Sequence, residues 1–416
     1  MKVAVIGAGG HVGLPFSLVV GAAGHKVIGV DTNGEIINQL YDKHYPYMEV
    51  GGQELLDSST VDFMGYMEVD RFKLLREQEV IAIMLGTPID AENNPRLDAI
   101  MDFVETQLIP NYVDGQLIIL RSTVSPGTTE LIRNTIQKAL GKREGMDFYL
   151  VFCPERVAQG VAIAESKKFP QLVGAFTYES FDKAKEFFDT FIENDCIFLT
   201  PEEAELGKLM TNMYRYVTIA LANEFYMIGQ EYRNVDVHKI TKAINLDYPR
   251  MNLPLPGPNV GGPCLFKDGK FLTQNIPYAD LIQTSFLINE GMPQFIMNIL
   301  KERYIEPHSL MIMGMTFKAD NDDTRNSLSF KLRKLCRAKG IQTVEVDPYL
   351  HDITKVEDWL RIDAIVVMTP HTGFQEFYND TIKKRRGSHA LVIDIWKYLD
   401  DSKKTTNGIF ELGMYQ

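Results

Sequence analysis

Residues 1–31 read MKVAVIGAGGHVGLPFSLVVGAAGHKVIGVD. The apolar stretch Lys2–Gly7 predicts a strand, Leu14–Ala23 after a glycine turn predicts a helix, and Lys26–Asp31 predicts a second strand. A strand, a crossover helix and a second strand form a βαβ unit with parallel strands. This stretch therefore predicts a Rossmann-type domain.

The rest of the chain continues with alternating apolar patterns. Short apolar segments predict further strands at Val80–Leu85, Gln116–Leu120, Phe148–Phe152 and Cys196–Leu199. Long helical patterns then replace the strands at Glu202–Glu231, Val235–Ile244 and Ala279–Tyr304. A second series of strands and helices follows at Leu310–Met315, Ser327–Lys339, Thr343–Val346, Ala364–Met368 and Ala390–Ile395. We expect an α/β fold in which a central helical dimerisation domain joins two Rossmann-type doubly wound domains, with boundaries at 1–200, 201–304 and 305–416.

Composition excludes several classes of function. The 416 residues carry a formal net charge of −12, which gives no basic field for binding nucleic acid. No uncharged apolar stretch reaches the roughly 18 residues of a membrane span, and the first residues lack a signal-peptide pattern. We therefore expect no membrane partner and a cytoplasmic location. The four cysteines are spaced too widely for a disulfide framework or paired zinc ligands, so no metal is expected: Cys153, Cys196, Cys264 and Cys336.

The glycine turn after the first strand predicts a dinucleotide site. Gly7, Gly10 and Gly13 follow the spacing GxxGxxG, with Gly9 beside them, and can let a pyrophosphate approach the N-terminus of a helix. Asp31 ends the second strand, where a carboxylate accepts hydrogen bonds from ribose hydroxyls and repels a 2′-phosphate. Glycines also occur in βα turns that bind nothing. The order of strand, turn, helix, strand and aspartate favours NAD.

Polar residues follow several of the later strands. Thr87 and Thr123 lie in loops at the carboxyl edge of the expected sheet, where each could contact the cofactor or a water, or cap a turn. Glu155 follows Pro154 after another strand. Glu155 is either a general base toward water or an acid in the first turn of a helix.

A glycine- and proline-rich segment carries the most reactive groups. Residues 257–268 read GPNVGGPCLFKD and place Cys264 near Lys267 and Asp268, so that the thiol pKa could be lowered and a thiolate could attack a carbonyl. An isolated cysteine is more often a small buried apolar residue. Lys208 and Asn212 lie four residues apart on one helix face and could hold an oxyanion together, although both could also be solvated.

Taken in order, eight motifs resemble the UDP-glucose/GDP-mannose dehydrogenase family. They are GAGGHVGLP at 7–15, GTP at 86–88, STV at 122–124, CPERVAQG at 153–160, ELGKLMTN at 205–212, YPRMN at 248–252, GPNVGGPCLFKD at 257–268 and GMTFKADNDDTRNS at 314–327. The glycine turn is one residue longer than the family's usual GLGYVG. The resemblance implies an N-terminal domain for NAD, a helical centre that forms a homodimer, and a C-terminal domain for the nucleotide of a UDP-sugar.

The resemblance also implies a role for each catalytic residue. Cys264 would be the nucleophile, Lys208 and Asn212 would stabilise the oxyanion, and Asp268 would assist proton transfer through water. Glu155 would promote thioester hydrolysis, and Thr123 would help to place the water. The first general base stays open between Lys208 and a water bound to Asp268.

Binding residues follow from the same motifs. The cofactor would contact Gly7, Gly10, His11, Val12, Gly13, Asp31, Thr87 and Thr123. The substrate would contact Glu155, Arg156, Val157, Lys208, Asn212, Arg250, Gly261, Lys318 and Arg325. Of these, Arg250 would reach the substrate of the partner subunit, and the basic groups would bind phosphate, which guanidinium binds bidentately.

The implied reaction turns a C6 alcohol into an aldehyde, a thiohemiacetal on Cys264, a thioester and finally a uronate of the kind used in polysaccharide biosynthesis. The ERV and PRMN motifs resemble enzymes that act on UDP-N-acetylhexosamines, and CLFKD resembles the glucose type. UDP-N-acetylmannosamine is therefore the favoured substrate, with UDP-glucose and UDP-N-acetylglucosamine as alternatives. Two other classes remain: a two-electron hydroxyacid or epimerase-type oxidoreductase, and a non-catalytic protein that senses or assembles nucleotide sugars.

Overall fold

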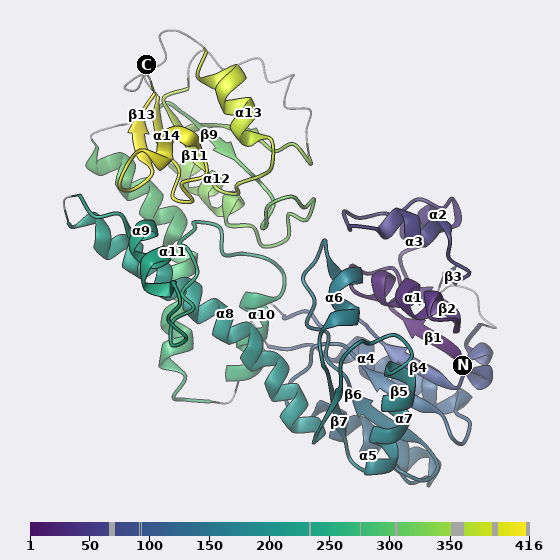
Figure 1. Ribbon diagram of the computed structural model, residues 1–416. Helices are drawn as coiled ribbons and strands as arrows, with labels where there is room; N and C mark the ends of the chain where they lie inside the picture. Colours follow the sequence, from purple (N-terminus) through teal and green to yellow (C-terminus); the bar gives the residue numbers. More distant parts are fainter. Residues whose placement is uncertain are drawn as a thin grey trace. The chain divides into compact units, whose positions relative to one another are not determined.

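The computed structural model describes residues 1–65, 71–90, 92, 94–232, 234–274, 276–303, 307–350, 362–384 and 390–412. The chain forms two compact units, of which the first comprises Met1–Thr211 with Lys267–Ile276 and the second Asn212–Phe266 with Pro277–Gln416 (Figure 1). Tyr304, where we expected the third central helix to end, lies outside the described residues.

The first unit is an α/β domain. Its strands are β1 Lys2–Ile6, β2 Lys26–Asp31, β3 Asp62–Gly65, β4 Val80–Ile83, β5 Leu117–Leu120, β6 Tyr149–Phe152, β7 Gln171–Ala175 and β8 Cys196–Leu199. Its α-helices are α1 Gly13–Ala22, α2 Gly34–Tyr41, α3 Gly52–Asp57, α4 Asp98–Phe103, α5 Thr128–Leu140, α6 Ala162–Lys168 and α7 Tyr178–Phe188. Shorter turns of helix are η1 Arg71–Glu77, η2 Val104–Leu108 and η3 Ile109–Asn111.

The eight strands form one sheet in the order β3-β2-β1-β4-β5-β6-β7-β8. Strands β1 to β6 run parallel, with the strand order of a dinucleotide-binding fold and its reversal between β1 and β4. Strand β7 runs antiparallel to β6, and β8 runs parallel to β7. We had not expected β3 or β7, because a polar residue begins each strand and a glycine interrupts its apolar pattern. The doubly wound sheet is therefore mixed at one edge.

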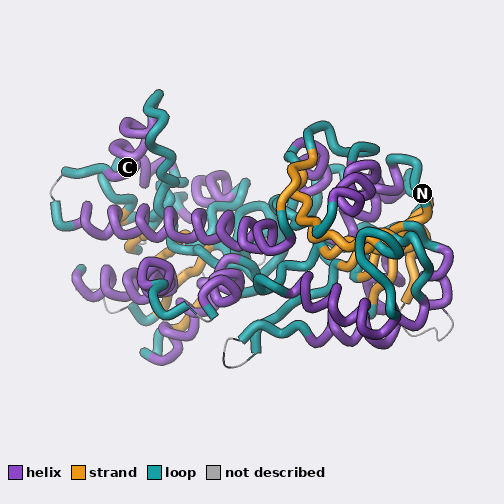
Figure 2. The backbone as a smooth tube through the Cα atoms, turned by 90° about the horizontal axis from the view of Figure 1, so that it is seen from below, coloured by secondary structure: helices purple, strands orange, loops and turns teal. Residues whose placement is uncertain are grey.

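Both faces of this sheet are buried under helices (Figure 2). Val3 and Val5 of β1 pack on one face with apolar residues of α1 and α7, while Ala4 and Ile6 pack on the other with residues of α4 and α5. Alternate residues of a strand point to opposite faces, so a strand covered on both sides must be apolar throughout. This explains why the apolar runs in the sequence identify the central strands.

The second unit contains the long helices and a smaller sheet. The helices are α8 Pro201–Gln230 and α10 Leu265–Thr273, which also contribute residues to the first unit, with α9 Val237–Asn245, α11 Asp280–Glu302, α12 Leu328–Ala338, α13 Phe374–Phe377, η6 Tyr378–Ile382 and α14 Asp400–Lys403. The strands are β9 Ser309–Met313, β10 Gln342–Val346, β11 Ala364–Val367, β12 Leu391–Ile393 and β13 Ile409–Glu411, in the order β10-β9-β11-β12-β13. Only the unexpected β13 pairs antiparallel among these described strands.

The turn after β9 repeats the turn after β1. Gly7 and Gly314 both have φ of 92°, and each donates its N–H to the carbonyl at the end of the next strand, Val30 or Val346, at 2.8 Å. The chain therefore contains two Rossmann-like α/β modules and a helical region between them in sequence, as expected.

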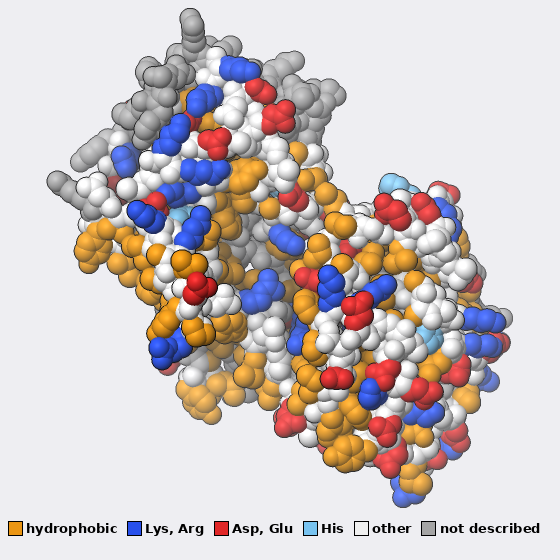
Figure 3. All heavy atoms as spheres, in the orientation of Figure 1, with side chains coloured by type: hydrophobic (Ala, Val, Ile, Leu, Met, Phe, Trp, Pro, Cys, Tyr) orange, Lys and Arg blue, Asp and Glu red, His pale blue; other side chains and the backbone are white. Residues whose placement is uncertain are grey.

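Helices α8, α9 and α11 leave apolar side chains at the surface. Figure 3 shows hydrophobic side chains gathered on the part of the second unit where α9 and α11 lie. On α8, a helically spaced stripe is more than a third exposed and consists of Tyr214, Leu221, Phe225 and Ile228. None of the helices in the described part of the chain combines the length and apolar character that a membrane span requires.

The start of α8 is fixed to the start of α5 by Glu205. This carboxylate is 1% exposed and accepts hydrogen bonds from the N–H of Gly127 at 2.6 Å, and from the N–H and hydroxyl of Thr129 at 2.8 and 2.6 Å. Burial raises the pKa of the Glu205 carboxyl, and the three hydrogen bonds act in the opposite direction. Glu205 therefore satisfies the N–H groups that begin α5.

We predict that Glu205→Ala lowers the free energy of unfolding by roughly 2 to 4 kcal/mol, because buried N–H groups lose their acceptor. Urea denaturation of the purified variant measures the change. Glu202→Ala, an exposed position on the same helix, is the control and should shift the midpoint little. Equal midpoints for the native chain and Glu205→Ala would contradict the anchoring role.

Candidate active site

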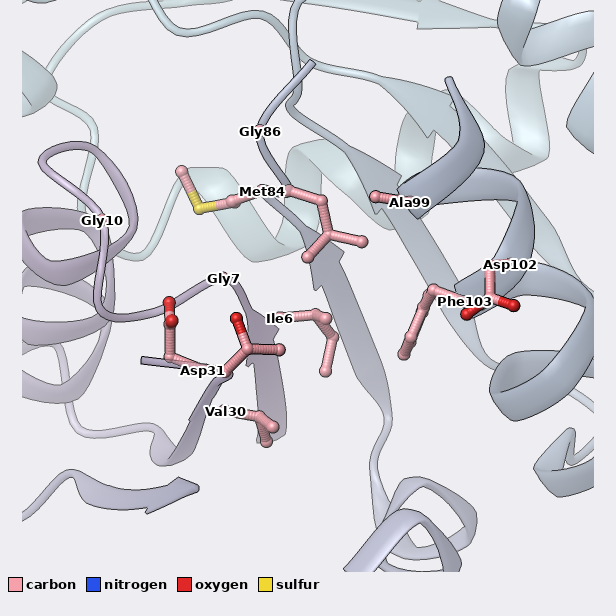
Figure 4. Close-up of a pocket in the computed structure, with 12 residues that line it drawn as sticks. Ile6, Gly7, Gly10, Val30, Asp31, Met84, Gly86, Ala99, Asp102 and Phe103 are labelled. Carbon is pink, nitrogen blue, oxygen red and sulfur yellow. The ribbon is translucent and has the colours of Figure 1, made fainter. Parts of the chain in front are cut away.

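A cavity of about 430 Å³ lies at the carboxyl edge of the first sheet, where the strand order reverses (Figure 4). Its walls come from the ends of β1, β2 and β4 and from α4. The lining residues are Ile6, Gly7, Gly10, Val30, Asp31, Thr32, Met84, Leu85, Gly86, Ala99, Asp102 and Phe103. In open α/β sheets this crevice is the usual ligand site.

Three glycines of the turn are closely packed, Gly7 and Gly13 against backbone atoms and Gly9 against side chains. A Cβ on Gly7 would lie 2.5 Å from the Met84 carbonyl oxygen, and a Cβ on Gly13 would lie 2.0 Å from the Gly7 carbonyl oxygen. A Cβ on Gly9 would lie 2.9 Å from the Asp31 carboxyl carbon. Gly10 lines the cavity, but a Cβ there would have no neighbour closer than 3.6 Å. The close-packed positions therefore include Gly9, which we had placed beside the motif, and not Gly10.

Asp31 presents its carboxylate at the end of β2, in the wall of this cavity. One oxygen accepts the N–H of Gly9 at 2.8 Å, and the other accepts the N–H of Asn33 at 2.9 Å. These bonds tie the acid to the glycine turn. The glycine turn and the acid fit the adenosine and pyrophosphate of NAD, because NAD needs close backbone approach and an acceptor for ribose hydroxyls.

His11 and Val12 complete the turn before α1. Val12 is exposed, whereas the His11 ring packs against the Tyr47 ring at a tilt of 33°, with 3.8 Å between ring centroids. The Nδ1 atom of His11 lies 2.8 Å from Nε2 of Gln159. The Tyr47 hydroxyl donates to the carbonyl of Gly9 at 2.5 Å. No sequence pattern had indicated Tyr47, because it lies outside all the motifs and is brought into contact with the glycine turn only by folding.

The loops after β4 and β5 are joined to residues of α10 within the first unit. The Thr87 hydroxyl donates to the carbonyl of Thr123 at 2.6 Å, and Lys267 Nζ donates to the Thr87 hydroxyl at 3.2 Å. Lys267 Nζ also lies 3.4 Å from Asp268 Oδ1, and Asp268 is 1% exposed. Lys267, expected to act on the thiol, thus binds the strand-end loop that holds Thr87.

Glu155 lies in a dense set of contacts after β6. Its carboxylate pairs with Arg121 and accepts the N–H of Arg156 at 2.9 Å and of Val157 at 3.3 Å. Its backbone carbonyl accepts a hydrogen bond from Lys208 Nζ at 2.6 Å. Lys208 is therefore not a solvated lysine, and Glu155 does not begin a helix, since α6 starts at Ala162.

Arg156 is held differently from its neighbours. Its guanidinium donates to the carbonyl of Pro170, and burial lowers its pKa from the ordinary value. The Arg156 side chain is therefore fixed to the segment before β7.

Cys264 is exposed, unlike the other cysteines. Burial raises the pKa of the Cys196 and Cys336 thiols to about 11 and raises that of Cys153 further above its ordinary value. Those three thiols are protonated near neutral pH and are poor nucleophiles. The reading of Cys264 as a small buried apolar residue is wrong.

The loop before Cys264 is held within the second unit by a buried asparagine. Asn259 Nδ2 lies within hydrogen-bonding distance of the Thr316 carbonyl at 2.9 Å and the Thr369 hydroxyl at 2.8 Å, and its Oδ1 accepts the Leu328 N–H at 2.9 Å. A Cβ on Gly261 would lie 2.3 Å from the Asn326 carbonyl oxygen. Gly261 is therefore required by packing, and Asn259 is an anchor that motif reading had not singled out.

The other expected substrate residues of the second unit differ in their surroundings. Lys318 and Arg250 are exposed, with the Arg250 guanidinium 5.0 Å from the Tyr248 ring centroid, and Asn212 is buried on α8. Arg325 is more than half exposed and binds Asp323 through two nitrogens, Nε at 2.9 Å and Nη2 at 2.6 Å. The Arg325 guanidinium thus already has a carboxylate partner, which we had not expected.

Comparison with known proteins agrees with this arrangement. Three domains of the UDP-glucose/GDP-mannose dehydrogenase family match the chain: the NAD binding domain at 1–192, the central domain at 202–290 and the UDP binding domain at 311–401. The UDP-N-acetyl-D-mannosamine dehydrogenase of Methanococcus aeolicus is 32% identical over 98% of this chain and 92% of its own. That of Pyrococcus horikoshii is 32% identical over 95% of both chains.

Solved structures give the same result. A UDP-D-ManNAc dehydrogenase from Pyrococcus horikoshii superposes with a TM-score of 0.85 at 29% identity, covering 95% of each chain. The chain belongs to the UDP-glucose/GDP-mannose dehydrogenase family. It is an NAD-dependent UDP-sugar dehydrogenase, an oxidoreductase, and the non-catalytic and hydroxyacid alternatives are set aside.

We predict that Asp31→Ser moves the cofactor preference toward NADP, because the carboxylate that repels a 2′-phosphate is gone. The ratio of kcat/KM for NAD to that for NADP should fall by about tenfold or more, which corresponds to about 1.4 kcal/mol. Steady-state assays with each cofactor measure it.

Asp102→Asn is the matched control, since Asp102 lines the same cavity from α4. Its cofactor ratio should stay close to that of the native chain. An unchanged ratio in Asp31→Ser would show that Asp31 does not contact the ribose.

Proposed function

We propose that this enzyme oxidises the C6 primary alcohol of UDP-N-acetylmannosamine to the carboxylate, giving UDP-N-acetylmannosaminuronate. Relatives at 32% identity over more than nine-tenths of both chains carry that activity in their names, which supports this choice of sugar. UDP-glucose and UDP-N-acetylglucosamine are the alternatives. The product would be a precursor of polysaccharides, made in the cytoplasm.

The exposed thiol of Cys264 carries the proposal, because an oxidation that stops at a carbonyl has no use for it. The thiol adds to the C6 aldehyde and gives a thiohemiacetal, which again has a C–H bond to lose. Oxidation of the thiohemiacetal gives a thioester. Water then cleaves the C–S bond, releasing the uronate and the free thiol.

The other side chains act on charge and protons. Lys208 and Asn212, one helical turn apart on α8, supply a cation and an amide donor to the oxygen that becomes negative. Glu155 promotes attack by water on the thioester, with Thr123 helping to hold that water. The first proton is removed either by Lys208 or by a water bound to Asp268.

NAD, when bound, accepts the hydride in each of the two oxidations. Gly7, Gly10, His11, Val12 and Gly13 would hold the pyrophosphate, Asp31 would bind the adenosine ribose, and Thr87 and Thr123 would also contact the cofactor. The residues 1–200 form this cofactor domain.

The remaining sequence binds the substrate. Residues 305–416 bind the UDP half, with Lys318 and Arg325 toward the phosphates. The loop residues Glu155, Arg156, Val157 and Gly261 contact the sugar. Residues 201–304 form the central domain, from which Arg250 reaches the substrate of a second subunit.

The first test measures NADH formed per sugar with UDP-N-acetylmannosamine, UDP-N-acetylglucosamine, UDP-glucose and GDP-mannose. We predict two NADH per UDP-N-acetylmannosamine for the native chain. In Cys264→Ser, complete turnover should slow by about a thousandfold or more, because the leaving thiolate is lost.

Cys196→Ser is the control, since that half-buried thiol has no role in the proposal. Its stoichiometry and rate should equal those of the native chain. One NADH per sugar, or full activity of Cys264→Ser, would overturn the thioester route. Two NADH with another sugar alone would correct the substrate.

We also propose that the enzyme is a homodimer through the apolar stripe of α8. An exposed row at Tyr214, Leu221, Phe225 and Ile228 favours burial against a second copy, since so large an apolar stripe is unfavourable in water. The family resemblance gives the same expectation.

We predict that Leu221→Glu with Phe225→Glu converts the dimer to monomers, because unpaired charges at an interface cost several kcal/mol. Sedimentation velocity measures the mass. Leu131→Glu on α5 is the control, a similarly exposed leucine of the first unit, and should remain dimeric. A native chain that sediments as a monomer would contradict the proposal.

A further inference from the structure

Arg121 is a buried cation in the first unit that no motif had indicated. It follows β5 directly, donates its backbone N–H to the Ile83 carbonyl at 2.9 Å, and is 5% exposed. Its guanidinium carbon lies 4.4 Å from the Phe16 ring centroid and 5.5 Å from that of Phe188. Aromatic faces stabilise a cation, but a charge removed from water also needs an ionic or hydrogen-bonding partner.

The two polar partners of the Arg121 guanidinium are Glu155 itself and Gln171, which binds the residue before Glu155. One guanidinium nitrogen, Nη2, pairs with the Glu155 carboxylate, and the other, Nη1, donates to Gln171 Oε1 at 3.3 Å. Gln171 Nε2 in turn donates to the Pro154 carbonyl at 3.2 Å. The Arg121 guanidinium therefore binds the Glu155 carboxylate directly and the Pro154 carbonyl through the side-chain amide of Gln171.

This arrangement depends on the antiparallel strand β7. Phe152 of β6 pairs with Gly174 of β7, so the start of β7 lies beyond the carboxyl end of β6. Gln171 is the first residue of β7 and thus meets the segment that carries Pro154 and Glu155. A parallel strand in this position would bring its carboxyl end there instead.

The rest of Glu155 is fixed as well. Its second carboxylate oxygen accepts the N–H groups of Arg156 and Val157, and its backbone carbonyl accepts Lys208 Nζ. The carboxylate is 14% exposed and is held on both oxygens. A group that must direct a water molecule works best when its position is set before the reaction.

We propose that Arg121 is the positioning residue for Glu155 and so sets the rate of thioester hydrolysis. The inference rests on the proposed function, in which Glu155 promotes that step. Arginine is suited to the role because its planar fork holds two partners at fixed angles, whereas a lysine ammonium is a single point of charge.

The test separates formation of the thioester from its hydrolysis. Rapid mixing of the native chain, Arg121→Gln and Arg121→Lys with NAD and UDP-N-acetylmannosamine gives the first-turnover NADH burst and the later steady rate. Intact mass after acid quenching gives the fraction of Cys264 that carries the sugar nucleotide. Arg133→Gln is the matched control, because Arg133 also lies over a ring, Phe176 at 4.2 Å, and pairs with Glu130.

In Arg121→Gln we expect the burst and the KM for the sugar to stay within about twofold, while the steady rate falls by about 10- to 100-fold and the adduct accumulates. Arg121→Lys should recover part of the steady rate. With Glu155→Gln already present, adding Arg121→Gln should change hydrolysis by less than about twofold, because Arg121 acts through Glu155.

Three results would overturn the inference. The first is an equal fall of burst, steady rate and NAD affinity in Arg121→Lys and Arg121→Gln, which indicates a folding role. The second is a fall in the hydrolysis rate on adding Arg121→Gln to Glu155→Gln that equals its fall in the native chain. The third is an unchanged hydrolysis rate in Arg121→Lys and Arg121→Gln. If Arg121→Gln does not fold, the same measurements on Arg121→Lys and on the double variant Arg121→Lys with Glu155→Gln test the inference. If neither the native chain nor the slowed Glu155→Gln variant carries any Cys264 adduct, the proposed function itself fails, and this inference with it.

Discussion

Close contact between backbone atoms at the turn after β1 is the constraint on which the first unit depends. The carbonyl of Gly7 lies where a Cβ on Gly13 would be, and the space for a Cβ on Gly7 is filled by the Met84 carbonyl. Helix α1 can therefore pack closely onto β1 and β2 beside the cavity at the carboxyl edge. The turn at Gly314 meets the same condition beside Thr369, so both modules begin from one backbone device.

Carboxylate side chains fix the loops around the glycine turn after β1. Asp31 joins the glycine turn to the end of β2, and Glu205 joins the first turn of α5 to α8. Glu155 accepts the N–H groups of its own loop and pairs with buried Arg121. Loops have no ladder of hydrogen bonds, so acidic side chains supply the acceptors that their N–H groups need. Positions in the proposed site are thus set by acids on neighbouring elements.

The two modules differ at the acid found at the carboxyl end of their second strand, which is the last residue of β2 and the residue after β10. Asp31 lines an open cavity, whereas Asp347 is completely buried and accepts N–H groups of Met315 and Thr316 and the ring of His371. A ribose can therefore approach the first carboxylate, and not the second. One fold, used twice, presents different chemistry because different neighbours occupy the same edge.

The sequence by itself determined the two α/β modules, the long helices between them, the glycine turn with Asp31, and the glycine- and proline-rich motif around Cys264, whereas the structure decided that Cys264 is exposed. These features depend on local pattern: apolar strands buried on both faces, helical spacing, and a loop rich in glycine and proline. Only the tertiary structure decided that β7 runs antiparallel, that Gly9 rather than Gly10 is close-packed, and that Arg325 binds Asp323. It also decided that Arg121, Tyr47 and Asn259 anchor the loops of the site. Their partners lie far along the chain, and only folding brings such distant groups within hydrogen-bonding distance.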